Sequence, residues 1–182
     1  MKTNLLTLFL LMIFLTACNA QNISNFNILD KFTSSGYMGD VRNIIVKKNY
    51  NDNGRPDSLC TKITYSAGDS GWGGVYWQYP ANNWCQKKGM DFSKSGYKRL
   101  TFYVKGANGG EEVKFKVGQD CGDSFVSDEL VLRLTKSWNK STIDLVGKDL
   151  SNITGAFCWI VDSKANTDGT VTFYIDDVQF EK

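Results

Sequence analysis

Apolar and polar residues alternate in short runs along most of the chain, as they do in half-buried β-strands. The clearest run is 59–66, which alternates over its whole length. In the run 113–117, two lysines alternate with three apolar residues, so the lysines should face water and the apolar residues a core. No segment shows a convincing helical period.

About ten such runs follow one another, separated by turn-forming residues. The expected strands are 28–32, 41–46, 59–66, 72–79, 100–104, 113–117, 130–134, 142–145, 155–161 and 171–180. Turns are expected at 34–36 and 67–71, and a longer loop at 49–58. We expect 72–79 to pair with 59–66, and 100–104 to form a hairpin with 113–117. The pattern predicts an all-β fold, an antiparallel two-sheet β-sandwich or jelly roll.

The first residues have the composition of an export signal. A positive start at Lys2 precedes an apolar run over 5–15, which is too short to span a bilayer. The residues that close this run, 15–18, read Leu-Thr-Ala-Cys and resemble the bacterial lipobox. This resemblance implies a lipoprotein signal peptide over 1–17, a lipid on Cys18, a tether over 18–27 and a domain over 28–182. The alternative is an ordinary signal peptide cut after Ala20, which would release a secreted protein.

Under the lipobox interpretation, the residues after the cysteine carry information on sorting. Asn19 follows Cys18, and no aspartate stands there. By resemblance to bacterial sorting rules, this favours anchoring in the outer membrane of a bacterial envelope.

Four further cysteines remain in the domain under either interpretation: Cys60, Cys85, Cys121 and Cys158. An even number in an exported protein predicts two disulfides. Three pairings are possible. Antiparallel strand order favours Cys60 with Cys85 and Cys121 with Cys158. No Cys-x-x-Cys spacing occurs, so a zinc or redox motif is not expected.

Charge and the absence of histidine narrow the functional classes. The chain has 21 basic and 19 acidic residues, which gives no electrostatic footprint for nucleic acid. It has no histidine, so the usual general base and the Ser/His and Cys/His nucleophile pairs are excluded. Glycoside hydrolysis needs only two carboxylates, so that activity stays an alternative. Its candidates are Asp69, Asp91, Glu111, Glu112, Asp120, Asp123, Asp128 and Glu129. Most of them stand in turns and nothing pairs them, so we expect no enzyme.

Residues 71–84 hold three of the five tryptophans, together with tyrosines and a cluster of amides. Flat aromatic faces beside amides suit a sugar, which is apolar on its C–H faces and polar at its edges. Strand alternation assigns Val75 and Trp77 to the core. Gly73 and Gly74 should leave room for a ring to approach. The expected ligand-binding residues are Trp72, Tyr76, Gln78, Asn82, Asn83 and Trp84.

Three other segments, 97–106, 138–145 and 173–181, resemble strands of carbohydrate-binding modules in the galactose-binding-like jelly-roll superfamily. The resemblance covers about residues 28–181 and implies that fold. It also implies a structural calcium ion near the first and last strands, held by Asp176 with Asp177 beside it. The acidic residue that the family often has after the first-strand Phe is missing, because Thr33 follows Phe32. Asp30 or Asp40 would have to substitute.

The function expected from these observations is that of a membrane-anchored, exported, non-catalytic domain that binds glycans as a monomer. One alternative is an envelope protein-interaction or structural lipoprotein, in which 72–84 docks a protein partner. A second is a carboxylate-dependent glycoside hydrolase or its accessory module. A cleft walled by aromatics and amides would favour sugar, and a flat apolar patch would favour a protein partner.

Overall fold

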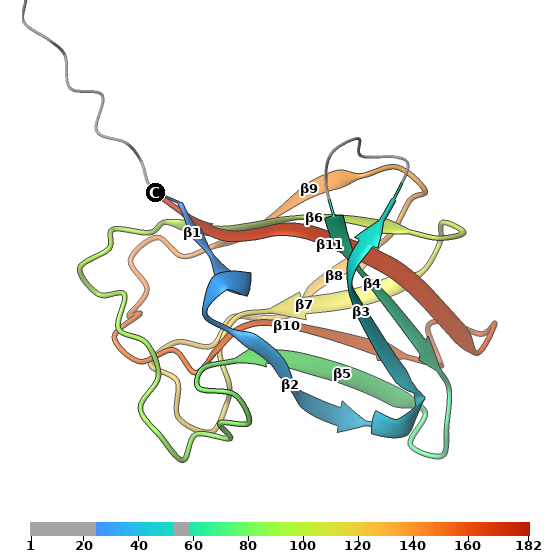
Figure 1. Ribbon diagram of the computed structural model, residues 1–182, viewed down its shortest axis with the longest axis horizontal. Coiled ribbons are helices and arrows are strands. Elements are labelled where there is room, and N and C mark those ends of the chain that lie inside the picture. The colour runs from blue at the N-terminus through green and yellow to red at the C-terminus, as the bar shows by residue number, and fades with distance from the viewer. Residues whose placement is uncertain (1–24, 53–58) are drawn as a thin grey trace, which may run out of the picture.

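The computed structural model describes residues 25–52 and 59–182, which form two antiparallel sheets packed face to face (Figure 1). The expected signal peptide, Cys18 and most of the expected tether lie outside the described residues, as does most of the expected loop at 49–58. A helix with the length and apolar character needed to cross a bilayer does not occur in the described ranges. The predicted all-β sandwich is confirmed.

One sheet has the strand order β3-β4-β11-β6-β9, and β1 pairs with β11. The other has the order β2-β5-β10-β7-β8. The first sheet comprises β1 (Phe26–Asn27), β3 (Ile44–Asn51), β4 (Leu59–Ser66), β6 (Arg99–Gly106), β9 (Asn139–Asp144) and β11 (Thr170–Glu181). The second comprises β2 (Thr33–Gly39), β5 (Trp72–Gln78), β7 (Glu112–Lys116), β8 (Leu130–Arg133) and β10 (Gly155–Asp162). Two 3₁₀ turns, η1 (Ile28–Asp30) and η2 (Val41–Asn43), flank β2.

Large rings fill the space between the sheets. Phe102 and Phe115 lie with ring centroids 4.7 Å apart, and Trp159 meets Phe173 edge-on at 5.3 Å. Aromatic pairs at such distances stabilise a core beyond the area that they bury. As expected, the apolar residues of the run 113–117 are buried. The core therefore uses one face of each strand and leaves the other face of each sheet outside.

The first expected strand and turn are wrong. Residues 28–30 form η1, because the Asn27 side chain accepts a hydrogen bond from the Leu29 N–H and caps a turn. The expected turn at 34–36 lies inside β2, where the register shifts at a bulge between Ser34 and Gly36. The first half of the expected strand 41–46 forms η2.

Both expected hairpins are also wrong. β4 and β5 belong to different sheets, and so do β6 and β7. Each of these strands buries one face. Two consecutive strands can do this either by pairing edge to edge in one sheet or by packing across the core in two sheets, so alternation does not distinguish the two arrangements. The short turns 67–71 and 107–111 therefore carry the chain from one layer to the other.

The cysteine pairing requires a correction. One disulfide is formed among the described residues, between Cys85 and Cys121, with the two Cα atoms 5.8 Å apart. Cys60 and Cys158 are buried free thiols. Cys60 lies in β4 and Cys158 in β10, and each faces away from the core on its own sheet, so they stand on opposite outer faces. The expected pairs Cys60–Cys85 and Cys121–Cys158 are therefore absent.

Candidate functional site

We call the outer side of the sheet β2-β5-β10-β7-β8 the β5 face. Its position follows from the register, in which Trp72 pairs with Asp162 and Tyr76 with Cys158. Val75 and Trp77 point to the opposite side and are buried in the core. The division of strand 72–79 into two sides, predicted from its alternation, is confirmed.

Two indole rings are exposed at this face, at the start of β5 and in the loop that follows it. Trp72 is 38% exposed and Trp84 43%. The Trp84 ring packs edge-on against Tyr76, with centroids 6.4 Å apart. Tyr76 itself is nearly buried, and burial raises the pKa of its phenol. Tyr76 lies four positions after Trp72 in the strand, which corresponds to about 13 Å. The rings can therefore contact more than one unit of an extended ligand.

Apolar side chains line the surface between the two tryptophans. The sequence did not predict them as part of the site. A Cβ at Gly74 would lie 3.1 Å from the Met38 side chain and 3.2 Å from that of Ile160. Met38 stands between the expected turn at 34–36 and the expected strand at 41–46, so the sequence did not predict its side of the sheet. A Cβ at Gly73 would lie 2.8 Å from the Tyr65 ring. Both glycines therefore make room for protein neighbours, and the expectation that they make room for a ligand is corrected.

The basic residues of β7 and β8 on the β5 face each have a carboxylate partner. Lys114 pairs with Glu129 at 3.0 Å, and Lys116 with Asp120 at 3.1 Å. Arg133 pairs with Glu112 at 3.3 Å. Each positive charge on this part of the β5 face is thus neutralised by a neighbouring carboxylate.

A buried network of side-chain amides lies beneath the loop that follows β5 and carries Trp84, which we call the Trp84 loop. The Gln78 Nε2 donates to Gln119 Oε1 at 2.9 Å and to the Asn83 carbonyl at 3.2 Å, and its Oε1 accepts from Ser35 Oγ. Gln119 in turn donates to the Thr154 hydroxyl and to the Asn83 carbonyl. Gln78 is fully buried. Its amide supports the loop, which corrects the expectation that it contacts a ligand.

Asn83 has the same supporting role. Its Nδ2 donates to the carbonyls of Tyr79 and Lys87, and its Oδ1 accepts from the Lys87 N–H. It is 3% exposed, so it too is removed from the expected ligand-binding set. Asn82 is exposed, with φ of 59°, and lines a hollow of about 220 Å³ with Pro80, Gln86 and others.

The Trp84 loop is tied to the loops after β7 and β9, which gather at the same end of the sandwich (Figure 1). The Cys85–Cys121 disulfide joins it to the turn 119–123. Asp123 then accepts hydrogen bonds from the N–H groups of Gln119, Thr154 and Gly155 at 2.7–2.9 Å. Trp84 is therefore held by covalent and hydrogen-bonded support that comes from sequence-distant loops.

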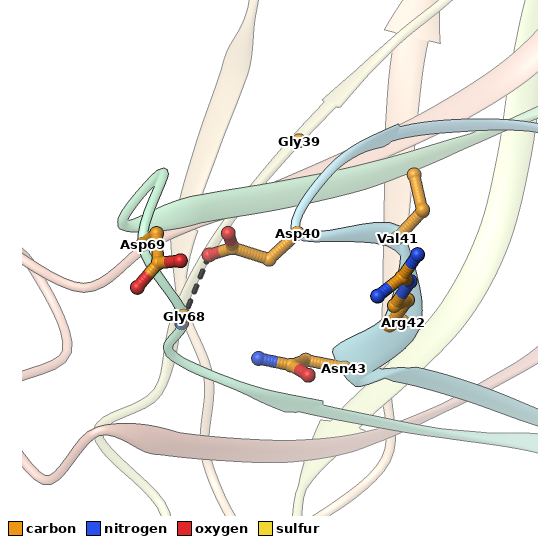
Figure 2. Close-up of a pocket in the computed structure, with 7 residues that line it drawn as sticks. All are labelled: Gly39, Asp40, Val41, Arg42, Asn43, Gly68 and Asp69. Atoms are coloured by element: carbon orange, nitrogen blue, oxygen red, sulfur yellow. Dashed lines mark hydrogen bonds between the residues drawn. The ribbon is translucent and has the colours of Figure 1, made fainter.

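Asp40 lies at the opposite end of the sandwich, beside a pocket of about 330 Å³ that Asp69 also lines (Figure 2). Its carboxylate accepts hydrogen bonds from the Gly68 and Ser70 N–H groups and from the Tyr65 hydroxyl, at 2.8–2.9 Å. Desolvation of the carboxylate raises its pKa, but the hydrogen bonds outweigh this effect and hold the pKa of Asp40 below its usual value. Asp40 therefore fastens the 67–71 turn.

The residues expected to hold calcium do not assemble into a ligand set. Asp30 lies in η1, and Asp40 is surrounded by the hydrogen-bond donors just described. Asp176 is nearly buried in β11, where its Oδ1 accepts from the Asp177 N–H. Within residues 25–52 and 59–182, no group of three or more carboxylate or cysteine side chains is placed to hold a metal ion. A structural calcium ion therefore stays a prediction of the sequence.

The carboxylates considered for glycoside hydrolysis are used in other ways. Glu112, Asp120 and Glu129 form the ion pairs described above. Asp123 supports a turn, Glu111 accepts from the Asn108 N–H, and Asp91 accepts from the Ser93 N–H. Most of this set is thus committed to protein partners.

The model of one protein family, "Carbohydrate binding domain 30", matches residues 22–182. The chain belongs to this family. Its domain is accordingly a carbohydrate-binding module. No curated protein matches the chain.

Solved modules of this kind share the fold. A family 30 module is 15% identical, with TM-score 0.53, and the match covers 87% of this chain and 99% of that one. The family 30 module of a cellulosomal cellulase of Clostridium thermocellum is 12% identical, with TM-score 0.54, covering 88% and 95%. A family 11 module of another Clostridium thermocellum cellulase is 11% identical, with TM-score 0.55, covering 87% and 93%.

Proposed function

We propose that this carbohydrate-binding module is an exported, membrane-anchored and non-catalytic domain that binds an uncharged glycan chain on its β5 face. The observation that carries the proposal is the pair of exposed indoles, Trp72 and Trp84, on one outer face of a sheet. Indole faces pack against the C–H surface of pyranose rings and bury a large apolar area. Trp72 and Tyr76, against which Trp84 packs, stand about 13 Å apart along β5, and this spacing favours a chain over a single sugar.

The pairing of the basic residues on this face argues against an acidic ligand. Lys114, Lys116 and Arg133 are each neutralised by a carboxylate within 3.3 Å. A charged sugar would gain little attraction there, whereas the hydroxyls of a neutral sugar can exchange hydrogen bonds with the edges of the pairs. Asn82 is the one member of the expected amide set whose side chain is open to a ligand.

Export and anchoring are proposed from the N-terminal residues and the disulfide. The Cys85–Cys121 bond needs an oxidising compartment, which is found outside the cytoplasm. The lipid on Cys18 would then hold the module at the envelope, in the outer membrane. Mass spectrometry of the mature protein should find a diacylated or triacylated cysteine at its N-terminus. An unmodified N-terminus at Gln21 would refute the anchor.

Affinity electrophoresis in soluble neutral polysaccharides tests the glycan proposal. Trp72→Ala and Trp84→Ala should each weaken binding at least about tenfold, as expected for exposed aromatic anchors. Ile45→Ala is a matched control, because Ile45 is an apolar side chain exposed on the other sheet. All variants should melt within a few degrees of the parent. If the parent binds no neutral glycan, or both tryptophan variants bind like the parent, the proposal is wrong.

A further inference from the structure

The opposite outer side of the sandwich carries a second cluster of aromatic and basic residues, which the proposed function does not use. We call the outer side of the sheet β3-β4-β11-β6-β9 the β11 face. One cross-strand row on it runs Lys47, Lys62, Tyr174, Lys105 through β3, β4, β11 and β6. The residues next to this row, such as Ile63 and Phe173, point to the other side and are buried in the core.

Three aromatic rings lie side by side along this row. Tyr50 and Tyr174 have ring centroids 5.7 Å apart, and Tyr174 and Trp138 are 6.4 Å apart. The Lys62 ammonium lies 5.0 Å from the Tyr50 centroid and 5.9 Å from that of Tyr174. Lys47 lies 5.4 Å from the Tyr50 centroid. The lysine ammonium groups thus lie over the rings and form with them a mixed aromatic and cationic surface.

The charge of this surface differs from that of the β5 face. Lys105 pairs with Asp52 at 2.7 Å, and Asp52 also accepts from the Trp138 Nε1. For Lys47 and Lys62, no carboxylate of the described residues lies within the 4.0 Å of an ion pair. These two lysines are also direct cross-strand partners, an arrangement of like charges that costs stability. An anion placed between them would remove that repulsion.

We propose that the β11 face binds an acidic polysaccharide, a glycan whose sugars carry carboxylate or sulfate groups. The Tyr50 and Tyr174 rings would pack against sugar C–H surfaces, and Lys47 and Lys62 would bind the acidic groups. Selectivity for an acidic glycan needs both the lysines and the rings. Ammonium groups alone attract any polyanion, whereas neighbouring rings offer a continuous apolar surface to a row of sugars. The module then has two glycan surfaces on opposite sides, selective for different charge.

Binding of the full mature protein to polygalacturonate and to chondroitin sulfate tests this site, with calorimetry at low and moderate salt. Lys47→Gln/Lys62→Gln should lose at least tenfold in affinity for one or both glycans, and the parent's affinity should fall as salt rises, because exposed charges are screened. Tyr50→Ala should weaken glycan binding but leave any binding of inorganic polyphosphate unchanged. Trp72→Ala should leave acidic-glycan binding intact, which separates this site from the β5 face.

A matched control removes the same charge elsewhere. Lys94→Gln/Lys98→Gln also removes two exposed lysines, from the segment before β6, and should bind acidic glycans like the parent. Equal loss in both double variants would show attraction by net charge alone and overturn the proposal. Equal affinity of the parent for polyphosphate and for the glycans would do the same. Binding to vesicles that contain anionic lipid, with none to either glycan, would assign the surface to a membrane and also overturn it.

Discussion

The two outer faces of this sandwich both present aromatic rings, but they treat charge in different ways. On the β5 face, Lys114, Lys116 and Arg133 each have a carboxylate partner. On the β11 face, Lys105 is paired with Asp52, but Lys47 and Lys62, which are cross-strand partners on β3 and β4, have no carboxylate of the described residues within ion-pair distance. Rings alone therefore do not distinguish the ligands that the faces suit. The faces differ because two of the lysines beside the rings of the β11 face have no ion-pair partner among the described residues, whereas the basic residues of β7 and β8 on the β5 face each have one.

The faces also differ in what holds their rings in place. On the β5 face, Trp84 stands in a loop that is fixed by a disulfide and by buried amides. On the β11 face, Tyr50 and Tyr174 stand on strands, so the sheet itself positions them. Damage to the loop supports should therefore impair one face and spare the other.

Removing the disulfide should have the largest effect. Cys85→Ser/Cys121→Ser opens a link across a sequence separation of 36 residues. Chain-entropy arguments give a loss of about 3–4 kcal/mol of unfolding free energy. Neutral-glycan binding should weaken because Trp84 loses its anchor, while acidic-glycan binding at the β11 face should persist in the folded fraction. Denaturant unfolding and affinity electrophoresis measure both effects.

Thiol alkylation provides the control for that experiment. In the denatured, unreduced parent, Cys60 and Cys158 should react and Cys85 and Cys121 should not. Labelling of Cys85, or protection of Cys158, would contradict the pairing. In the native protein, burial and the charges of Asp52 and Asp176 raise the pKa of the Cys60 thiol to about 11, so its labelling should be slow.

The next largest effect is on stability and concerns Glu181, which neutralises the cations Arg99 and Lys140 on the β11 face. Glu181 accepts from Arg99 at 2.8 Å, from Lys140 at 2.9 Å and from the Thr101 hydroxyl at 2.8 Å. Burial of the carboxylate raises its pKa, but the hydrogen bonds outweigh this effect and lower the pKa of Glu181 to about 2. Because the folded-state pKa is depressed, the stabilisation is present above the ordinary pKa near 4.5 and is lost as pH falls towards 2.

Glu181→Gln should thus cost up to about 3 kcal/mol of unfolding free energy at pH 7, a ceiling set by the pKa shift. The difference between parent and variant should shrink between pH 4.5 and pH 2, as measured by denaturant unfolding across that range. Glu129→Gln is the counterpart on the β5 face. Its partner Lys114 and Glu129 itself are 33% and 41% exposed, so the loss should stay below about 1 kcal/mol. A difference for Glu181→Gln that stays constant with pH would contradict this account.

A smaller loss is expected from the amide network. Gln119→Ala removes the acceptor of the Gln78 amide and the donor to Thr154, and leaves a small cavity, at a cost of about 2 kcal/mol. Neutral-glycan binding should fall by a few-fold because the Asn83 carbonyl loses one of its donors. Gln119→Glu keeps the acceptor and should recover part of the stability. If both variants unfold like the parent, the network does not support the loop.

Sequence alternation predicted the sides of the strands well and their partners poorly. The assignment of Val75 and Trp77 to the core follows from the period of two, which is a local property. Strand pairing depends on which layer each strand joins, and Leu59–Ser66 gives no local signal that its neighbour in sequence crosses the core. The Cys60–Cys85 pair was wrong for the same reason, because it rested on pairing of 59–66 with 72–79. The Cys121–Cys158 pair was wrong although β7 and β10 do pair, because Cys121 lies in the loop after β7, where it meets Cys85.

The site was only partly predictable for a related reason. The exposure of Trp72 was predictable from strand alternation, and that of Trp84 from its position in the loop after the strand. Gln78 was misjudged, because strand alternation gives the side of a sheet but not whether a loop covers it. The row on the β11 face was not predicted, since Tyr174 lies in β11, which is far in the sequence from the strands β3 and β4 that carry Lys47 and Lys62.

The smallest expected effect is the sharpest test of the two-face comparison. Trp72 and Lys62 stand on opposite outer sides of the sandwich, and substitutions at separate sites without shared partners are usually additive within about 0.5 kcal/mol. In the double variant Trp72→Ala/Lys62→Gln, each glycan class should therefore bind as it does to the corresponding single variant. A coupling well above that limit, measured by calorimetry with either ligand, would mean that one glycan contacts both faces or that the sandwich transmits changes between them. Either result would end the description of the two faces as independent.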